Sequence, residues 1–193
     1  MELAVKQLLA RSADKLGIEI RRELEGALDR YLDVLLAWNR KINLTAVRDP
    51  AGIVVRHFLD SLSVLPYLPQ GTEALVDVGS GAGFPGAVLA LARPHLRVTL
   101  VEPNHKKSAF LQAIKRDVPI PNVEVATARY EEFSSLRPMA FDVAISRATW
   151  DVLDWLSRAR ALVRPQGGLI IAMEGSERHV LPSTCERVEF EVG

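Results

Sequence analysis

Residues 77–86 read Asp77-Val78-Gly79-Ser80-Gly81-Ala82-Gly83-Phe84-Pro85-Gly86 and stand between a short apolar run and a helix-like stretch. The run before them, Ala74 to Val78, predicts a buried strand, and Pro85 to Ala92 predicts a helix. Glycines let a backbone turn tightly and come close to a ligand. A glycine turn from strand into helix lies at the carboxyl end of a parallel sheet, where such sheets bind nucleotides.

Downstream of this turn, short apolar runs alternate with helix-like stretches. The runs that predict strands are Ala74 to Val78, Val98 to Val101, Val123 to Ala126, Phe141 to Ile145 and Leu169 to Met173. The helices predicted between them are Pro85 to Ala92, Lys106 to Arg116 and Asp151 to Val163, with a less regular connection around Arg129 to Phe133. This alternation predicts an α/β fold, a mainly parallel, doubly wound sheet covered on both faces.

The first 70 or so residues have helical periodicity instead. Apolar residues recur at intervals of three and four residues from Arg21 to Trp38, which predicts a helix with one buried face. A second helix is expected from Asp49-Pro50 to Pro66. We therefore expect two parts, an N-terminal helical extension over 1–72 and a Rossmann-like domain over 73–193. Arg187 to Val192 is the only stretch left for further strands, so we expect a shortened sheet edge.

Composition limits the class of protein. The chain has 193 residues, of which 48% are hydrophobic and 25% charged, as in an ordinary globular domain. Its longest apolar run, Pro85 to Ala92, is far below the roughly 18 residues of a membrane-spanning helix. A single cysteine, Cys185, gives no disulfide framework and no metal-ligand spacing, which points to the reducing cytoplasm and to no metal.

Overall charge does not indicate a nucleic-acid binder, because Lys+Arg and Asp+Glu are equal at 24 each. Any contact with RNA must come from local patches. The candidates are Arg40 and Lys41 in the helical extension, and Lys106 and Lys107 at the start of the helix predicted from Lys106 to Arg116. A solvated helix face is the commoner explanation for such a run.

Two carboxylates flank the glycine turn. Asp77 would repel a pyrophosphate but suits a cationic amine, such as that of S-adenosylmethionine. Glu102 ends the second strand 19 residues after Gly83 and can accept hydrogen bonds from both hydroxyls of a ribose. An adenosine ligand without phosphate fits both, so Asp77, Gly81 and Gly83 are assigned to its site together with Glu102. Two other interpretations of the glycine turn stay open. It also satisfies the dinucleotide-binding pattern G-x-G-x-x-G, and it could be a tight turn with a purely structural role.

Two further strand ends reach the same rim. Arg129-Tyr130-Glu131 follows the third strand, where it could meet an adenine edge or be only an exposed acidic turn. Ser146-Arg147-Ala148 ends the fourth strand, and Arg147 is expected to point into the mouth of the site unless it is simply solvated.

The fourth-strand rim lacks two kinds of methyl-transfer chemistry. It has no cysteine for attack through pyrimidine C6, and no Asn/Asp-Pro-Pro-aromatic segment for an exocyclic amine. An acceptor that is nucleophilic when neutral, such as guanine N7, needs only placement, so Arg147 is expected to orient the reactants with no general base. His57 and Asp60 are then expected to form a plain hydrogen-bonded pair that fixes their helix to the sheet.

Several segments, in order, resemble the bacterial ribosomal small-subunit methyltransferase G family, also called glucose-inhibited division protein B. They are Trp38-Asn39-Arg40-Lys41-Ile42-Asn43-Leu44-Thr45-Ala46, His57-Phe58-Leu59-Asp60-Ser61-Leu62, Asp77 to Gly86, Lys106-Lys107-Ser108-Ala109-Phe110-Leu111, Arg129-Tyr130-Glu131-Glu132-Phe133, Phe141 to Ala148, and Arg164-Pro165-Gln166-Gly167-Gly168. The glycine motif is common to all class I methyltransferases, whereas the first two segments are much more specific to this family.

The resemblance implies a cytoplasmic enzyme with a class I fold. It would transfer methyl from S-adenosylmethionine to guanine N7 in the 16S rRNA loop beside the decoding centre, leaving 7-methylguanosine and S-adenosylhomocysteine. By motif match, the cofactor site would include Gly79, Phe84, Glu102, Tyr130, Glu131 and Arg147. The substrate would be 16S rRNA in the context of the small ribosomal subunit.

Two other functions use the same fold. An NAD-dependent oxidoreductase would need a hydride-handling residue, for which the helical extension supplies no obvious candidate. A non-enzymatic adenosyl-ligand or RNA-binding module would keep the fold without turnover.

Overall fold

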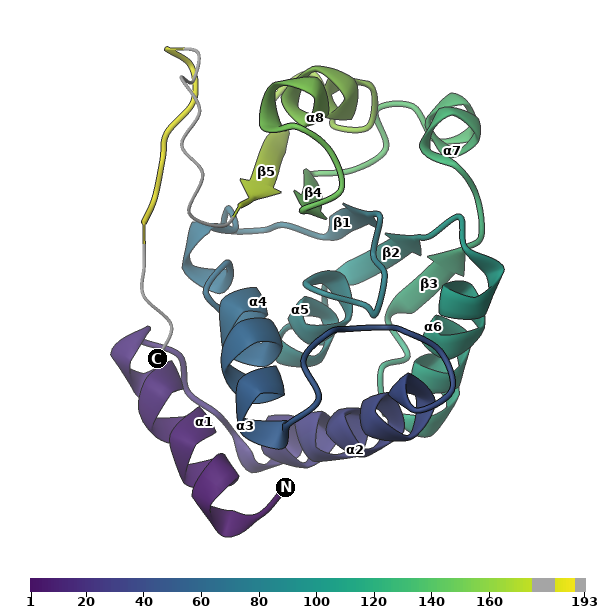
Figure 1. Cartoon of the computed structure of the whole chain (residues 1–193). Coiled ribbons are helices and arrows are strands. Elements are labelled where there is room, and N and C mark those ends of the chain that lie inside the picture. The colour runs from purple at the N-terminus through teal and green to yellow at the C-terminus, as the bar shows by residue number, and fades with distance from the viewer. Residues whose placement is uncertain (175–182, 190–193) are drawn as a thin grey trace.

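The computed structural model describes residues 1–174 and 183–189, and its centre is a five-stranded parallel sheet (Figure 1). The strands lie in the order β3-β2-β1-β4-β5. Their bounds are β1 Ala74–Val78, β2 Arg97–Val101, β3 Val123–Ala126, β4 Val143–Arg147 and β5 Leu169–Met173. All pairings are parallel, so every carboxyl end reaches one edge of the sheet, and the predicted fold class is confirmed.

The fourth strand begins two residues later than the sequence predicts. Phe141 forms only an isolated bridge with Val163, whereas Ser146 and Arg147 pair with Ala172 and Met173 of β5. Hydropathy alone ended the predicted strand at Ile145. The polar Ser146 is accommodated in the buried strand because its hydroxyl donates to the carbonyl of Val78 at 2.9 Å. Arg147 is therefore part of the strand.

Helices cover both faces of the sheet, and Figure 1 shows α7 and α8 on one face with α2, α5 and α6 on the other. One buried cluster joins alternate strand residues such as Leu75 and Leu100 to the N-terminal helices, α5 and α6. A second joins Val76 and Val78 to α7 and α8. The bounds are α5 Gly86–Ala92, α6 His105–Asp117, α7 Tyr130–Leu136 and α8 Val152–Arg158.

Two of these helices correct the sequence prediction. The connection predicted as less regular around residues 129–133 is the regular helix α7, because Phe133 packs into the core against Phe141. Helix α8 is capped by Asp151 but ends at Arg158, where a short 3-10 turn, Ala159–Ala161, takes over. It is therefore shorter than predicted.

The N-terminal helices are α1 Leu3–Lys15, α2 Arg22–Asn39, α3 Pro50–Ile53 and α4 Asp60–Leu62, followed by a 3-10 turn, Leu65–Tyr67. Helix α2 begins and ends within a residue of its prediction. The predicted second helix is interrupted, because a π-helix, Val54–Leu59, separates α3 from α4. A π-turn shifts the side chains that follow it around the axis, and such turns are frequent at functional sites.

The C-terminal prediction is only partly described. Residues 183–189 contain no strand, and residues 190–192 of the predicted edge lie outside the described residues. Within the described ranges, no helix is long and apolar enough to cross a membrane. The same ranges contain no group of three His, Cys, Asp or Glu side chains that could hold a metal ion.

Candidate functional site

The glycine loop needs glycine at specific positions. Gly79, Gly81 and Gly83 have φ of +76°, +56° and +84°, a region that side chains rarely adopt. A Cβ on Gly79 would collide with the side chain of Thr149, and one on Gly83 with the hydroxyl of Tyr31. The loop therefore follows a path that is fixed by both local geometry and its neighbours.

Asp77 lies fully buried where β1 enters this loop. Its Oδ2 accepts a hydrogen bond of 2.8 Å from the backbone N–H of Gly86. Its Oδ1 is buried and has no partner among the described residues. Burial raises the pKa of Asp77 from 3.8 to about 7, although the Gly86 N–H and Arg147 oppose the rise. A cationic donor from a ligand would satisfy this oxygen and restore the charged form.

Glu102 lies buried just after the end of β2 and holds the loop from the other side. Its Oε2 accepts from the N–H of Gly81 at 2.8 Å, and its Oε1 accepts from the N–H of Asn104 at 2.9 Å. A carboxylate oxygen can accept more than one hydrogen bond, so both oxygens retain capacity for hydroxyl donors. Together with Asp77, this set of acceptors fits an adenosyl group that carries an ammonium.

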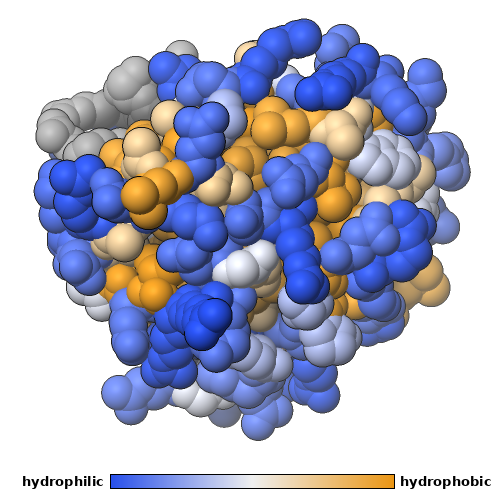
Figure 2. Space-filling view, turned by 90° about the horizontal axis from the view of Figure 1, so that it is seen from below, coloured by the Kyte–Doolittle hydropathy of each residue, from blue (hydrophilic) through white to orange (hydrophobic). Residues whose placement is uncertain are grey.

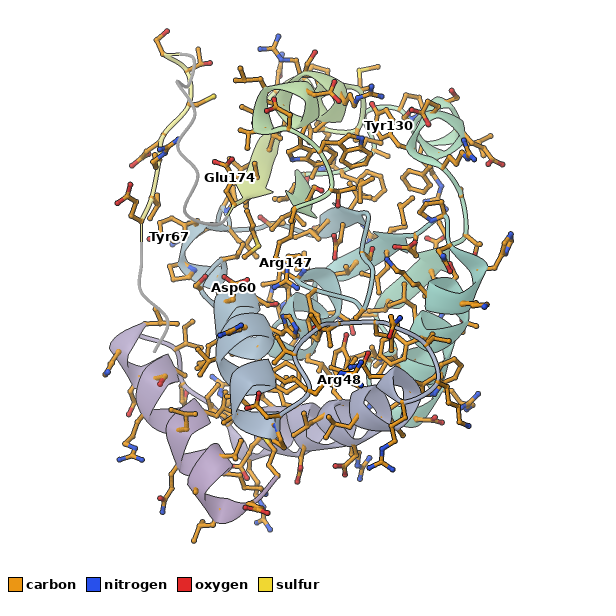
Figure 3. All side chains as sticks on the ribbon, viewed as in Figure 1. Arg48, Asp60, Tyr67, Tyr130, Arg147 and Glu174 are labelled. Atoms are coloured by element: carbon orange, nitrogen blue, oxygen red, sulfur yellow. The ribbon has the colours of Figure 1, made fainter. Side chains whose placement is uncertain are left out.

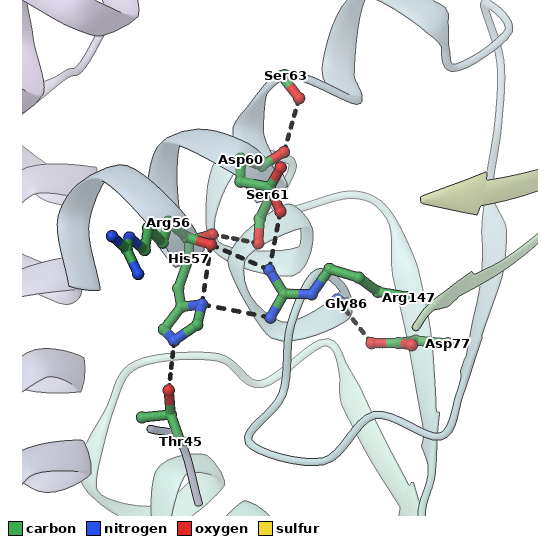
Figure 4. Close-up of polar contacts among 9 residues, drawn as sticks. All are labelled: Thr45, Arg56, His57, Asp60, Ser61, Ser63, Asp77, Gly86 and Arg147. Carbon is green, nitrogen blue, oxygen red and sulfur yellow. Dashed lines mark hydrogen bonds and ion pairs between the residues drawn. The ribbon is translucent and has the colours of Figure 1, made fainter. Parts of the chain in front are cut away.

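Arg147 extends from the end of β4 to the π-helix and α4 (Figure 4). Its Nη1 donates to Oδ2 of Asp60 at 2.8 Å and to the carbonyl of Arg56 at 3.2 Å. The guanidinium lies over the ring of Phe84 with 5.4 Å to the ring centroid. Arg147 thus joins three elements at the edge of the glycine loop and is not simply solvated.

His57 lies beside this arginine. Its ring stacks on Phe84 with centroids 4.7 Å apart, and its Nε2 lies 2.7 Å from Oγ1 of Thr45. Its Nδ1 lies 2.9 Å from the carbonyl of Arg56 and 3.4 Å from Nη2 of Arg147. Burial and then Arg147 lower the pKa of His57 to about 4, so the imidazole is neutral at neutral pH.

The predicted bond between His57 and Asp60 is wrong. Among the described residues, Asp60 pairs with Arg147, whereas His57 contacts Thr45, the carbonyl of Arg56 and Nη2 of Arg147. The prediction assumed α-helical spacing, whereas His57 lies in the π-helix and Asp60 begins α4. Both side chains still connect this segment to the sheet, but they do so through Arg147.

Tyr130 and Glu131 begin α7, and Figure 3 shows Tyr130 apart from Arg147. The hydroxyl of Tyr130 donates to the carbonyl of Arg158 at 2.7 Å, and Glu131 forms an ion pair with the side chain of the same residue. In the part of the chain that the structure describes, neither side chain bonds to the glycine loop. Phe84 does belong to the loop, but its ring is buried between Tyr31 and His57.

The basic residues predicted to meet RNA lie at two helix ends. Arg40 and Lys41 follow α2, while Lys106 and Lys107 form the first turn of α6, where Asn104 caps their N–H groups. Trp38 and Phe110 bring the two helices into edge contact, with ring centroids 5.8 Å apart. Figure 2 views the molecule from the side of α1 and α2 and shows polar side chains over most of this face, with apolar patches between them.

Two contributors to the site were missed by sequence reasoning. Tyr31 of α2 donates from its hydroxyl to the carbonyl of Ala82 in the glycine loop, and Thr149 packs against Gly79. The recurring apolar residues from Arg21 to Trp38 predict Tyr31 only as part of a buried helix face. Its polar hydroxyl in that stripe was the available signal, since a buried hydroxyl needs a partner.

A pocket of about 390 Å³ lies beside Arg147. It opens between the π-helix and α4 on one side and the ends of β4 and β5 on the other. Its lining residues are Val55, Arg56, Asp60, Arg147, Ala148, Met173 and Glu174.

A parallel sheet of this order, with a glycine turn after β1 and a buried carboxylate just after β2, is the Rossmann-like arrangement that class I S-adenosylmethionine-dependent methyltransferases share. A SAM dependent methyltransferase from Aquifex aeolicus has a similar structure, with a TM-score of 0.52 and 22% identity over 69% of this chain and 73% of that one. A methyltransferase from Geobacter sulfurreducens gives a TM-score of 0.53 at 18% identity, over 72% and 69%. These similarities concern the fold.

The chain belongs to the rRNA small subunit methyltransferase G family, whose model matches residues 25–183. Ribosomal RNA small subunit methyltransferase G of Burkholderia pseudomallei (strain 668) is 45% identical over 175 residues, covering 89% of this chain and 75% of the relative. The protein of the same name from Methylobacillus flagellatus is 43% identical over 171 residues, covering 89% and 81%. The resemblance seen in the sequence is confirmed, and neither an oxidoreductase nor a non-enzymatic module is favoured.

Proposed function

We propose that this enzyme methylates N7 of a guanine in 16S rRNA, in the loop beside the decoding centre, within the small ribosomal subunit. Family membership supplies the class of reaction, methyl transfer to small-subunit rRNA with S-adenosylmethionine as donor. The finer assignment adds the base, the atom and the location. It also includes the cytoplasm as the site of action, and a reaction that uses no metal.

The observation that carries the choice of N7 is the set of side chains around the pocket. Arg147 and Asp60 line the pocket as a guanidinium paired with a carboxylate, and the neutral imidazole of His57 lies behind them, stacked on Phe84. An in-plane lone pair on N7 is already nucleophilic, so a site that binds and orients is sufficient. The N7 lone pair forms the bond to the methyl carbon while the carbon–sulfur bond breaks with its electrons staying on sulfur. The base gains the positive charge, and no proton has to leave.

The cofactor supplies an activated methyl group on a sulfonium. We assign its binding to Asp77 for the ammonium, Glu102 for the ribose and the backbone of Gly79, Gly81, Gly83 and Phe84, with Tyr130 and Glu131 at the adenine side and Arg147 at the reacting end. The buried, unpartnered Oδ1 of Asp77 supports the first of these assignments. Arg147 also orients the acceptor base.

RNA would be held by local charge and not by a basic surface as a whole. We assign Arg40, Lys41, Lys106 and Lys107 to rRNA phosphates. In this proposal the helical extension, 1–72, contributes to substrate binding, and 73–193 forms the catalytic domain. A chain of zero formal net charge gains little non-specific affinity for RNA, which favours an assembled particle as substrate over naked RNA.

The test is methylation of unmodified small ribosomal subunits and of free 16S rRNA, followed by nuclease digestion and nucleoside mass spectrometry. We expect 7-methylguanosine at one position, formed faster on the subunit. Methylation at another atom or base would overturn the proposal. Loss of turnover in Cys185→Ala with retained cofactor affinity would indicate a thiolate mechanism instead.

A further inference from the structure

The pocket beside Arg147 has the size of a small-molecule site and a mixed lining. Its volume of about 390 Å³ falls within the roughly 300 to 1,000 Å³ of typical ligand pockets. Val55 and Met173 supply apolar surface for the faces of a flat base, and Asp60, Arg147 and Glu174 supply charge (Figure 3). The pocket adjoins the glycine loop because Arg147 lies over Phe84.

A donor and an acceptor stand side by side in this lining. Nη1 of Arg147 donates to Oδ2 of Asp60 at 2.8 Å and to the carbonyl of Arg56 at 3.2 Å, which uses both of its hydrogens. The donors left for a ligand are the N–H groups of Nη2 and Nε, and the side chains of Arg147 and Asp60 are 21% and 28% exposed. Arg147 can only donate and the ionised Asp60 can only accept. Within the described ranges, Oδ1 of Asp60 is not used by the ion pair with Arg147.

This arrangement matches one edge of guanine and opposes that of adenine. Guanine presents the acceptor O6 next to the donor N1–H, whereas adenine presents the donor N6–H₂ next to the acceptor N1. A phosphate is a poor alternative occupant, because it would face the carboxylates of Asp60 and Glu174 in the same lining.

We propose that Asp60 selects guanine by accepting the hydrogen bond of N1–H while Arg147 donates to O6. The proposal rests on the proposed function, which makes guanine N7 the acceptor. N7 is not used in these contacts, so it keeps its lone pair for the methyl group. Asp60 therefore acts on base identity, beyond its visible contact with Arg147.

The experiment uses the full chain and small subunits reconstituted with one changed base at the position that the wild type methylates. Particles carry guanine, inosine, 1-methylguanine or adenine, and single-turnover kcat/KM is measured with product mass spectrometry. With wild type we expect inosine to react within about threefold of guanine, because it keeps O6 and N1–H. We expect 1-methylguanine and adenine to react at least about tenfold more slowly, since a mismatched polar edge is costly.

The variant Asp60→Asn tests the residue itself. Its amide can donate to N1 of adenine, so we expect the guanine-to-adenine ratio to narrow about tenfold or more while affinity for S-adenosylhomocysteine stays within twofold. Ser63→Ala is the matched control, since among the described residues Ser63 Oγ bonds to the backbone carbonyl of Asp60 and to no side chain. We expect it to keep the wild-type ratio.

Each failure has its own signature. Equal loss on guanine and adenine particles in Asp60→Asn would show that Asp60 only holds Arg147, and would overturn selection. Wild-type activity on 1-methylguanine equal to that on guanine would overturn it without any variant having to fold. Absence of 7-methylguanosine from wild-type guanine particles would overturn the proposed function and this inference with it.

Discussion

The hydroxyl of Tyr31 donates a hydrogen bond of 2.6 Å to the carbonyl of Ala82, 51 residues away. This bond joins the N-terminal helix α2 to the middle of the glycine loop. The ring of Tyr31 also stacks on Phe84 of the same loop, with centroids 5.4 Å apart. The helical extension is thus part of the structure that shapes the loop.

Tyr31→Phe keeps the stacking and removes only the hydroxyl. The carbonyl of Ala82 then lies buried without its partner, which costs about 1 to 3 kcal/mol. We expect lower unfolding free energy and weaker binding of S-adenosylhomocysteine, measured by chemical denaturation and calorimetry. Lower stability with unchanged affinity would mean that the bond supports the core and does not position the loop.

Gly83→Ala and Gly81→Ala form a matched pair. Both place alanine at positive φ, which costs about 1 to 2 kcal/mol. Only at Gly83 does the new Cβ collide with the Tyr31 hydroxyl, whereas at Gly81 the nearest atom is 3.8 Å away. We expect the larger loss of thermal stability at Gly83, and partial recovery in Gly83→Ala combined with Tyr31→Phe. Equal losses for the two alanines would contradict the collision.

The glycine turn, the strands and their parallel direction were predictable because each depends on a short-range pattern. Hydrophobic runs mark strands buried on both faces, and glycines mark positive φ. The partners of Arg147 were not predictable, because they lie 87 and 91 residues away and depend on the π-turn. The pattern of apolar residues from Pro50 to Pro66 is compatible with an α-helix, so it gives no sign of the extra residue that turns Asp60 towards the sheet.

Asp77 gives a pH dependence that can be isolated. Its pKa in the folded state is about 7, against 3.8 as an ordinary carboxyl, so the folded state holds the extra proton between these values. Protonation of Asp77 therefore contributes fully to the free energy of unfolding below pH 3.8. This contribution is lost as the pH rises towards 7, and it amounts to a few kcal/mol at most. His57 has the opposite sign, because its lowered pKa of about 4 makes stability rise with pH up to 6.5.

The measurement is denaturant unfolding of wild type and Asp77→Asn from pH 5 to 8. Subtracting the two curves of unfolding free energy against pH cancels the contributions of His57 and of every other titrating group that both proteins share. We expect wild type to lose stability relative to the variant as pH rises. A difference that does not change with pH would show that Asp77 is already ionised in the ligand-free fold.

The role of Glu102 is tested by a thermodynamic cycle that combines a protein variant with a ligand analogue. A single variant is not enough, because the carboxylate also accepts from the N–H groups of Gly81 and Asn104. Glu102→Ala is expected to weaken binding of S-adenosylhomocysteine by about 1 to 3 kcal/mol. With the wild type, the 2′,3′-dideoxy analogue of S-adenosylhomocysteine should bind more weakly than S-adenosylhomocysteine by a similar free energy. With Glu102→Ala, removing the two hydroxyls should weaken binding little further. Additive losses would assign Glu102 to the loop alone and remove its contact with the ribose.

Arg147 is the residue on which the proposed reaction depends most. If it orients the reactants, Arg147→Ala should slow methyl transfer about 10- to 100-fold while changing cofactor affinity less, because orientation acts mainly in the transition state. Arg147→Lys should recover little. A lysine can pair with Asp60, but it cannot also donate to the Arg56 carbonyl and lie flat over Phe84 as the guanidinium does.

Single-turnover methylation of small subunits at saturating cofactor gives the rate of methyl transfer, and calorimetry gives the cofactor affinity. Arg97→Ala is the control, since it removes an exposed arginine paired with Glu73 at the far ends of the strands. Rates within about twofold across wild type, alanine and lysine, a barrier difference below about 0.5 kcal/mol, would leave Arg147 only as the connection between β4 and the π-helix.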